Sequence, residues 1–243
     1  MQSGEVIGVE ALIRWQHPEQ GLLPPAAFLP AIEATWLEVD LGEWVLDAAL
    51  QQLVHWQQEG IELPVSVNIS PTHLLADRFS QRLGELLAGY PEVPPAMLKL
   101  EVLESAALHD IQTALDTMAR CQALGISFAI DDFGTGFSSL THLRQLPVSL
   151  IKIDQSFVRD MLIDRDDMAI VESVIYMANR FCHPMLAEGV ETLSHARALM
   201  SLGCILAQGY GIARPMPAAA IPQWLIEWPA REDWNALASA PVS

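Results

Sequence analysis

The sequence predicts an α/β fold in which parallel strands and helices alternate to form a (β/α) barrel. Short apolar runs alternate with amphipathic stretches at helical spacing along the chain. The apolar runs are nearly continuous in their hydrophobicity, as is typical of parallel strands that are covered on both faces. The length of 243 residues suits one barrel, and the chain has no GxGxxG motif of an open dinucleotide-binding sheet.

The strands and helices of this fold are expected from the apolar pattern, in chain order. The predicted strands are Val6–Trp15, Val65–Ile69, Met97–Leu103, Ser127–Ile130, Leu150–Ile153, Met185–Ala187 and Ile205–Ala207. The predicted helices between them are Leu41–Gln58, Arg78–Leu87, Ile111–Leu124 and Met168–Phe181. Gly60 and Gly125 stand where two of these helices should end. Because a complete barrel has eight strands, the pattern predicts that one strand is missing.

Each predicted strand delivers a polar side chain near its C-terminal end, the edge at which barrel active sites assemble. The most unusual end is Asp131-Asp132, because two adjacent carboxylates after an apolar run repel each other and resist loss of water. We therefore expect them to face a shared opening that holds a cation. The other groups at strand ends are Glu10 with Arg14, Asn68, Glu101 with Glu104, Lys152 with Asp154, Glu188 with Glu191, and Gln208.

The strand ends would bring together several carboxylates, one amide and one lysine. Carboxylate and amide oxygens are preferred by Mg²⁺ and Mn²⁺, and two such cations sharing a carboxylate can hydrolyse phosphodiesters. Lys152 would then orient or help to activate the attacking water, although a lysine in a structural ion pair is the alternative. Proton abstraction of the enolase type and glycoside hydrolysis also remain open from these residues alone.

Composition narrows the possible functions. The formal net charge of −17 excludes duplex nucleic acid as an expected partner, since its binding needs Lys and Arg. The three cysteines form no CxxC pair, and the histidines show no HExxH spacing. The sequence therefore gives no indication of a zinc site. The N-terminus lacks the pattern of a signal peptide, and no apolar run is long enough to span a bilayer. These features predict a cytoplasmic protein.

A series of sequence blocks resembles the EAL domain family, bacterial phosphodiesterases that linearise cyclic di-GMP. The blocks are "GVEALIRW", "HPEQGLLPPAAFLPAIE", "VSVNIS", "KLEVLES", "IDDFGTGFSSL", "IKIDQSFV", "LAEGVET" and "AQGYGIARPM", and they follow the family's order from about residue 5 to about residue 217. The resemblance implies a TIM-like barrel with an EAL phosphodiesterase domain over residues 1–228 and a C-terminal tail over 229–243. It also implies a hydrolase that uses two Mg²⁺ or Mn²⁺ ions to form pGpG, with Ca²⁺ expected to inhibit.

The resemblance also assigns roles to individual residues. The metal ligands would be Glu10, Asn68, Glu101, Asp131, Asp132 and Glu188, and the catalytic residues Lys152, Glu188, Glu191 and Asp132. Substrate contacts are expected from Ile13, Arg14, Asp154 and Gln208. Glu104 matches the glutamate that anchors the flexible loop Asp132–Leu140. None of these positions is substituted, so an active enzyme is expected, and a receptor that binds cyclic di-GMP without cleaving it is the alternative.

Two departures from the family pattern are visible. The helix and strand that normally precede the EAL block are absent, which accounts for the missing strand and suggests a fragment of a longer protein. Such parents often carry sensor or GGDEF domains, form homodimers and can be anchored in the inner membrane. The second departure is Trp36, where the family usually has glycine, and which we expect to be packed locally.

Overall fold

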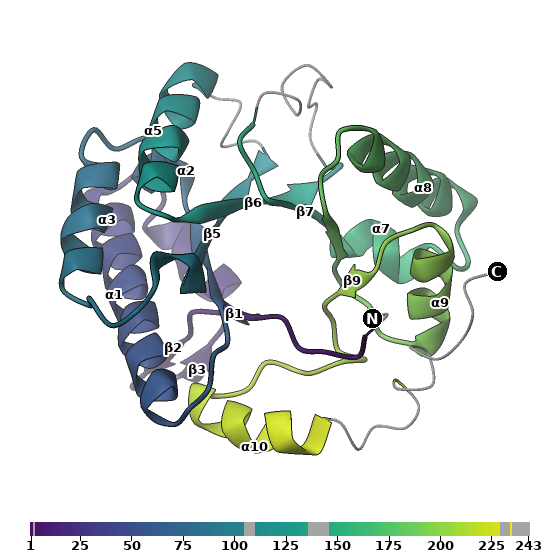
Figure 1. Cartoon of the computed structure of the whole chain (residues 1–243), viewed down its shortest axis with the longest axis horizontal. Coiled ribbons are helices and arrows are strands. Elements are labelled where there is room, and N and C mark those ends of the chain that lie inside the picture. The colour runs from purple at the N-terminus through teal and green to yellow at the C-terminus, as the bar shows by residue number, and fades with distance from the viewer. Residues whose placement is uncertain (2, 105–109, 136–145, 229–233, 235–243) are drawn as a thin grey trace. The chain divides into compact units, whose positions relative to one another are not determined.

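The computed structural model describes residue 1 and residues 3–104, 110–135, 146–228 and 234. These residues form two compact units, one of Ile7–Phe128 and one that combines Met1–Val6 with Ala129–Ser243. Each unit contains parallel strands with helices against them (Figure 1). No helix of the described residues is long and apolar enough to cross a membrane.

The unit of residues 7–128 has three parallel strands, β1 (Val9–Ala11), β4 (Val65–Ile69) and β5 (Leu98–Leu103). Its helices are α1 (Trp36–Gln58), α2 (Pro71–Leu74), α3 (Phe79–Ala88) and α5 (Ile111–Ala123), with the 3-10 turn η3 (Pro95–Met97). Helix α1 packs against β4, and α3 packs against α5. The sheet register places Asn68 opposite Glu101, so their side chains leave the same face of the sheet.

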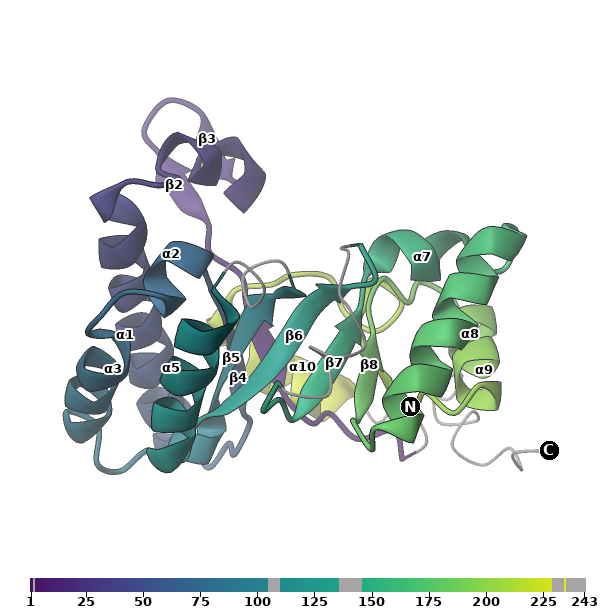
Figure 2. The ribbon, with the colours of Figure 1, turned by 90° about the horizontal axis from the view of Figure 1, so that it is seen from above.

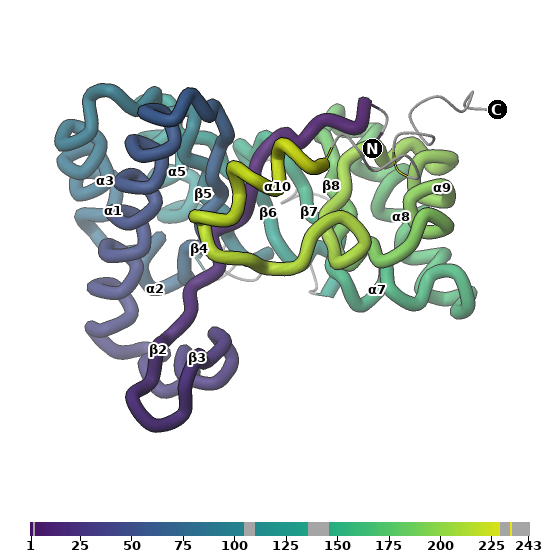
Figure 3. Tube along the Cα trace, turned by 90° about the horizontal axis from the view of Figure 1, so that it is seen from below, coloured from purple at the N-terminus to yellow at the C-terminus, as the bar shows by residue number. Residues whose placement is uncertain are grey.

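A small antiparallel hairpin interrupts this unit before α1. It consists of β2 (Trp15–His17) and β3 (Gly21–Leu23), and the 3-10 turns η1 (Pro25–Ala27) and η2 (Leu29–Ala31) follow it. Figures 2 and 3 show the hairpin beside the end at which α1 begins. The hairpin was not predicted, because an apolar run from Val6 to Trp15 resembles one continuous strand. In the structure only Val9–Ala11 of that run pairs in the parallel sheet.

The second unit has four strands, β6 (Ser127–Phe133), which begins at the boundary between the units, β7 (Leu150–Ile153), β8 (Met185–Ala187) and β9 (Leu206–Ala207). β7 pairs in parallel with β6 and β8, and β8 pairs with β9. Its helices are α7 (Gln155–Asp160), α8 (Arg165–Arg180), α9 (Leu193–Ser201) and α10 (Ile221–Glu227), with η4 (Ala218–Ala220). The N-terminal ammonium of Met1 donates to the carbonyl of Ile205 at 2.6 Å, which ties the N-terminal segment to this unit.

A β-bulge lies at the end of β6. Ile130 pairs with Ile151 and Phe133 pairs with Ile153, so β6 holds one more residue than β7 between these pairs. Within the bulge Asp132 has a φ of 53°, a left-handed conformation that Asp tolerates better than most residues. Consecutive side chains of a regular strand point to opposite faces, and a bulge changes where they point. The bulge therefore lets Asp131 and Asp132 serve the same site.

The predicted alternation of strands and helices is confirmed. The strands predicted at Val65–Ile69, Leu150–Ile153 and Met185–Ala187 have the predicted bounds, and Gly60 and Gly125 follow the ends of α1 and α5. Helices α2, α7, α9 and α10 were not predicted. The tail predicted from residue 229 and most of the loop predicted at 132–140 lie outside the described residues.

The expectation that Trp36 is packed locally is wrong. Trp36 is the first residue of α1, and its side chain is 71% exposed. Burial is decided by the side of the helix that faces the sheet, and the buried residues of α1 are Leu46, Ala49, Leu50, Leu53 and Trp56. The first two turns of α1 contribute nothing to this core, so a large apolar residue there remains in solvent.

Candidate active site

A buried lysine lies between two carboxylates in the unit of residues 129–243. The side chain of Lys152, in β7, is 1% exposed. Its ammonium lies 3.1 Å from Asp131 Oδ1 and 2.6 Å from Glu188 Oε1. A buried charge without partners would cost several kcal/mol, so these two contacts are what permits Lys152 to lie inside the sheet. The neighbouring strands supply them, since Asp131 belongs to β6 and Glu188 directly follows β8.

The carboxyl group of Asp132 is hydrogen bonded to that of Asp154. Burial, this hydrogen bond and the charge of Asp131 raise the pKa of Asp132 from its ordinary 3.8 to about 7. Burial also acts on Asp154, but hydrogen bonds donated by the backbone N–H and hydroxyl of Ser156 outweigh it and lower the pKa of Asp154. These opposite shifts favour the neutral form of Asp132 over that of Asp154.

Carboxylate oxygens of Asp131, Asp132 and Glu188 lie within 4.8 Å of one another. Three carboxylates beside the Lys152 ammonium leave an excess of negative charge, and the charge of Asp131 adds to the burial that raises the pKa of Asp132. A hard divalent cation prefers such oxygen donors and would offset the charge. The donor set of this cluster therefore fits Mg²⁺ or Mn²⁺.

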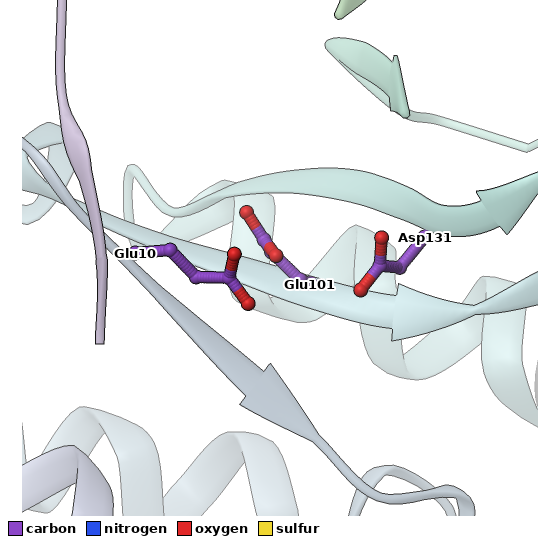
Figure 4. A group of neighbouring side chains, drawn as sticks. All are labelled: Glu10, Glu101 and Asp131. Atoms are coloured by element: carbon purple, nitrogen blue, oxygen red, sulfur yellow. The ribbon is translucent and has the colours of Figure 1, made fainter. Parts of the chain in front are cut away.

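A second group of polar side chains lies in the unit of residues 7–128. Asn68 of β4 donates from Nδ2 to Glu10 Oε1 of β1 at 2.6 Å. The carboxylates of Glu10 and Glu101 approach each other to within 4.8 Å and point toward one another in Figure 4. Glu101, in β5, is buried, as a carboxylate can be only where hydrogen bonds or charges offset the loss of water. The structure therefore brings together the three ligands predicted in this unit.

The other predicted residues occupy varied surroundings. Arg14 is half-buried and donates from Nη1 to the carbonyl of its neighbour Ile13 at 2.8 Å. Glu104 is buried at the end of β5, but most of the loop that it is predicted to anchor lies outside the described residues. Glu191 is exposed, and Gln208 is half-buried directly after β9. Their roles stay predictions.

Two backbone segments lie against each other beside Glu188. Val190 N–H donates to the Gln208 carbonyl at 2.9 Å, and Gly211 N–H donates to the Val190 carbonyl at 3.0 Å. A Cβ at Gly209 would lie 2.3 Å from Val190 N, and one at Gly211 would lie 2.6 Å from the Glu191 carbonyl oxygen. Only glycine permits this approach. The glycines of "QGYG" therefore support the loop that carries Glu188 and Glu191, a role that sequence reasoning missed.

Asp154 was also placed incompletely by sequence reasoning, which expected a substrate contact. The structure shows it as the N-cap of α7, where it accepts from Ser156 N–H at 2.9 Å and pairs with Asp132. The sequence does contain a signal for the cap, because Asp-Gln-Ser at the start of a helix is typical of an acid that caps its first turn. It contains none for the contact with Asp132, which depends on two separate strands.

Comparison with known proteins gives matches over most of the chain. The model of the EAL domain family matches residues 1–215. The bifunctional diguanylate cyclase/cyclic di-GMP phosphodiesterase MucR of Pseudomonas aeruginosa is 41% identical over 217 residues, which are 89% of this chain and 32% of that protein. A cyclic di-GMP phosphodiesterase of the same species is 37% identical over 225 residues, 93% of this chain and 38% of the relative. The chain thus spans about a third of the length of the curated relatives it matches.

Solved structures also match over most of the chain. A MucR phosphodiesterase in complex with cyclic di-GMP superposes with a TM-score of 0.86 at 40% identity, covering 90% of this chain and 89% of the other. The EAL domain of FimX from Pseudomonas aeruginosa, bound to cyclic di-GMP, superposes with a TM-score of 0.78 at 25% identity, covering 87% and 85%. The predicted fold class, a TIM-like α/β barrel, is confirmed by this likeness.

Proposed function

Because this chain belongs to the EAL domain family, we propose that it hydrolyses cyclic di-GMP to linear pGpG. The observation that carries the proposal is the Lys152 ammonium held between Asp131 and Glu188, with Asp132 beside them. These residues stand in the blocks "IDDFGTGFSSL", "IKIDQSFV" and "LAEGVET", in which the family resemblance predicts metal ligands and a catalytic lysine. The cyclic di-GMP in the matched complexes supports the choice of substrate.

The cation ligands of the proposed enzyme are its strand-end oxygens. Asp131, Asp132 and Glu188 would bind a divalent cation, and Glu10, Asn68 and Glu101 would supply the further ligands that the resemblance implies. Two Mg²⁺ or Mn²⁺ ions, when bound, supply positive charge to the phosphodiester and acidify a water molecule. An acidic protein repels an anionic dinucleotide unless cations lie between them. The surplus of carboxylates therefore supports the proposal that cations are bound at this site.

Lys152 has two tasks in this proposal. Its ammonium fixes the positions of Asp131 and Glu188, from strands on either side of β7, and so holds two predicted ligands at a constant separation. It would also donate a hydrogen bond that orients the attacking water. The attacking water gives up a proton as its oxygen bonds to phosphorus, the bond from phosphorus to one ribose oxygen breaks, and that oxygen takes up a proton, so the net addition of one water opens the cyclic dinucleotide.

Substrate contacts are assigned to Ile13, Arg14, Asp154 and Gln208. The Arg14 guanidinium suits a phosphate oxygen, because its planar donors match that geometry. Asp154 would act largely through Asp132, to which it is hydrogen bonded, rather than on the substrate alone. The homodimer and the fusion to sensor or GGDEF domains stay predictions of the resemblance, and the cytoplasmic location stays a prediction from composition.

A chromatographic assay tests the proposed reaction. The purified chain is incubated with cyclic di-GMP and Mn²⁺, with and without EDTA, and pGpG is quantified. We expect product that disappears with EDTA, and Asp131→Asn should lower turnover by roughly 100-fold or more because a ligand to the cation loses its charge. Asp116→Asn, at an exposed acid on α5, is the matched control and should retain full activity.

Two outcomes would contradict the proposal. Full turnover by folded, Mn²⁺-loaded Asp131→Asn protein would exclude the ligand role of Asp131. Tight binding of cyclic di-GMP in calorimetry without any pGpG would make the chain a receptor, which is the alternative function.

A further inference from the structure

The start of helix α1 exposes large apolar side chains that the proposed reaction does not use. Trp36 is 71% exposed, Trp44 is 58% exposed and Leu37 is 42% exposed. Trp36, Leu37, Asp40 and Trp44 lie within an arc of roughly 100° around the helix axis, given 3.6 residues per turn. We call this surface the α1 face. Exposed indoles grouped on one side of a helix are typical of a surface that binds another molecule, because each leaves apolar area in water.

Acids outnumber bases around the α1 face. The sequence holds no lysine or arginine between Arg14 and Arg78, whereas Asp40 and Glu43 lie within α1 and Glu33 lies three residues before it. Glu43 is bridged by Arg82 of α3 at 2.9 Å, and the Glu38 carboxylate accepts a hydrogen bond from Ala34 N–H. Asp40 lies on the α1 face itself and is exposed. The face therefore combines indole rings with the exposed carboxylate of Asp40.

This combination selects the kind of partner. Lysine and arginine are attracted both by carboxylates and by the faces of indole rings. A second copy of the same face, or an anionic lipid surface, would bring like charges together. The exposed side chains run along about 12 Å of the helix from Trp36 to Trp44, so they form a ridge that a second helix can pack against. We propose that the α1 face binds an amphipathic helix of a partner protein that carries lysine or arginine among its apolar residues.

The binding mode follows from the arrangement of the face. Apolar side chains of the partner helix would cover Trp36, Leu37 and Trp44, and its basic side chains would approach Asp40 and Glu33. The contact is one helix wide, so it belongs to the small and transient class of interfaces. It lies on the unit of residues 7–128 and uses none of the predicted ligands, so it can be tested apart from catalysis.

A pair of synthetic peptides tests this inference on the full chain. One is an amphipathic helix of leucine and lysine, and the other has glutamate in place of every lysine. Binding of each labelled peptide is followed by fluorescence anisotropy at physiological salt. We expect the lysine peptide to bind and the glutamate peptide not to bind. W36A/W44A and D40K should each lower the affinity for the lysine peptide by about tenfold or more. Turnover of cyclic di-GMP by these variants should match that of the unaltered chain.

I163A is the matched control, because Ile163 is 86% exposed and lies in the other unit. It should bind the lysine peptide as the unaltered chain does. Equal affinity of W36A/W44A and the unaltered chain would overturn the inference, since the peptide would then bind the acidic surface at large. A dimer in sedimentation equilibrium that W36A/W44A abolishes would also overturn the inference. So would a chain that binds vesicles of phosphatidylcholine and phosphatidylglycerol but does not bind the lysine peptide.

Discussion

The Lys152 ammonium and the carboxylates of Asp131 and Glu188 depend on one another, because none of them is well solvated. We expect Lys152→Met to lower the free energy of unfolding in EDTA by up to about 3–5 kcal/mol, since it leaves two buried carboxylates without their counter-charge. Mn²⁺ should reduce this loss, because a bound cation offsets the same carboxylates. Chemical denaturation with and without Mn²⁺ measures the difference.

Lys99→Met provides the comparison for this prediction. Lys99 is half-buried in β5, outside the acidic cluster, and its loss should be small and independent of Mn²⁺. A Lys152→Met variant that is destabilised equally in EDTA and in Mn²⁺ would contradict the idea that the ammonium and the cation act on the same carboxylates.

His73 is a second residue whose burial has a measurable consequence. Its ring is 2% exposed and contacts Phe79 edge-on, and a Cβ at Gly42 of α1 would lie 2.1 Å from its Nδ1. Within the described residues this Nδ1 has no hydrogen-bond partner. Burial lowers the pKa of His73 below 6.5, and the charges of Glu43 and Glu38 oppose that shift only partly. The folded chain therefore keeps His73 neutral where the unfolded chain protonates it.

This difference makes stability depend on pH. The unfolded state takes up the proton as the pH falls through about 6.5, and the folded state takes it up only at lower pH, so the free energy of unfolding falls as the pH falls through this range. We expect His73 to lower the free energy of unfolding by up to about 1 kcal/mol between pH 7 and pH 5.5, measured as the difference in pH dependence between the unaltered chain and His73→Phe, because the raised pKa of Asp132 acts in the opposite direction and is common to both. Urea titrations at both pH values measure it. His55→Gln, at an exposed histidine, is the control, and an unchanged pH dependence in His73→Phe would refute the prediction.

At the scale of elements, strand ends and tight loops position the site. The bulge in β6 brings Asp131 and Asp132 to one cluster, and the contact between the loop of residues 188–191 and "QGYG" supports Glu188. Gly211 tests this contact more cleanly than Gly209, whose φ is 154°. Gly211 does not have a positive φ, so a methyl group added there acts through its contacts and not through backbone strain.

We expect Gly211→Ala to displace the Glu191 carbonyl, which a Cβ would meet at 2.6 Å, and to shift Glu188 with it. Overpacking of this kind costs about 1–3 kcal/mol, and a misplaced catalytic group can cost roughly 100-fold in turnover. Assays of kcat and thermal unfolding measure both effects. In the matched Gly84→Ala variant the methyl would meet Leu124 in ordinary contact at 3.6 Å within α3, so activity should stay unchanged. Full kcat in Gly211→Ala would show that the loop does not set the position of Glu188.

At the scale of the whole molecule, charge governs the binding of the substrate. A chain with a formal net charge of −17 should bind an anionic dinucleotide only with cations present. We expect Ca²⁺, with its longer and looser coordination, to support binding of cyclic di-GMP but little turnover. At a hundred times the Kd, cyclic di-GMP with Ca²⁺ should stabilise the fold by about 2.7 kcal/mol. Calorimetry would show this as a raised Tm, and the same rise in EDTA would contradict it.

Much of this architecture could be predicted because the strands of a parallel sheet are short apolar runs with sharp ends. Val65–Ile69 and Leu150–Ile153 have the predicted bounds for that reason. The run Val6–Trp15 was wrongly predicted to be one strand, because apolar residues alone do not mark where strand pairing stops. It contains β1, and β2 of the hairpin begins at its last residue. Helices α7 and α9 were missed because they are short, and a short segment has little periodicity to detect.

The sequence by itself determined the family, the parallel α/β class and the acids and lysine at the strand ends, because these depend on residue types in a fixed order. Only the tertiary structure decided which groups meet. The contacts of Lys152 with Asp131 and Glu188, and of Asp132 with Asp154, join side chains from different strands, and sheet register and a bulge place them. The exposure of Trp36 was likewise decided by which face of α1 packs on the sheet, a choice made by the surrounding elements and not by the tryptophan.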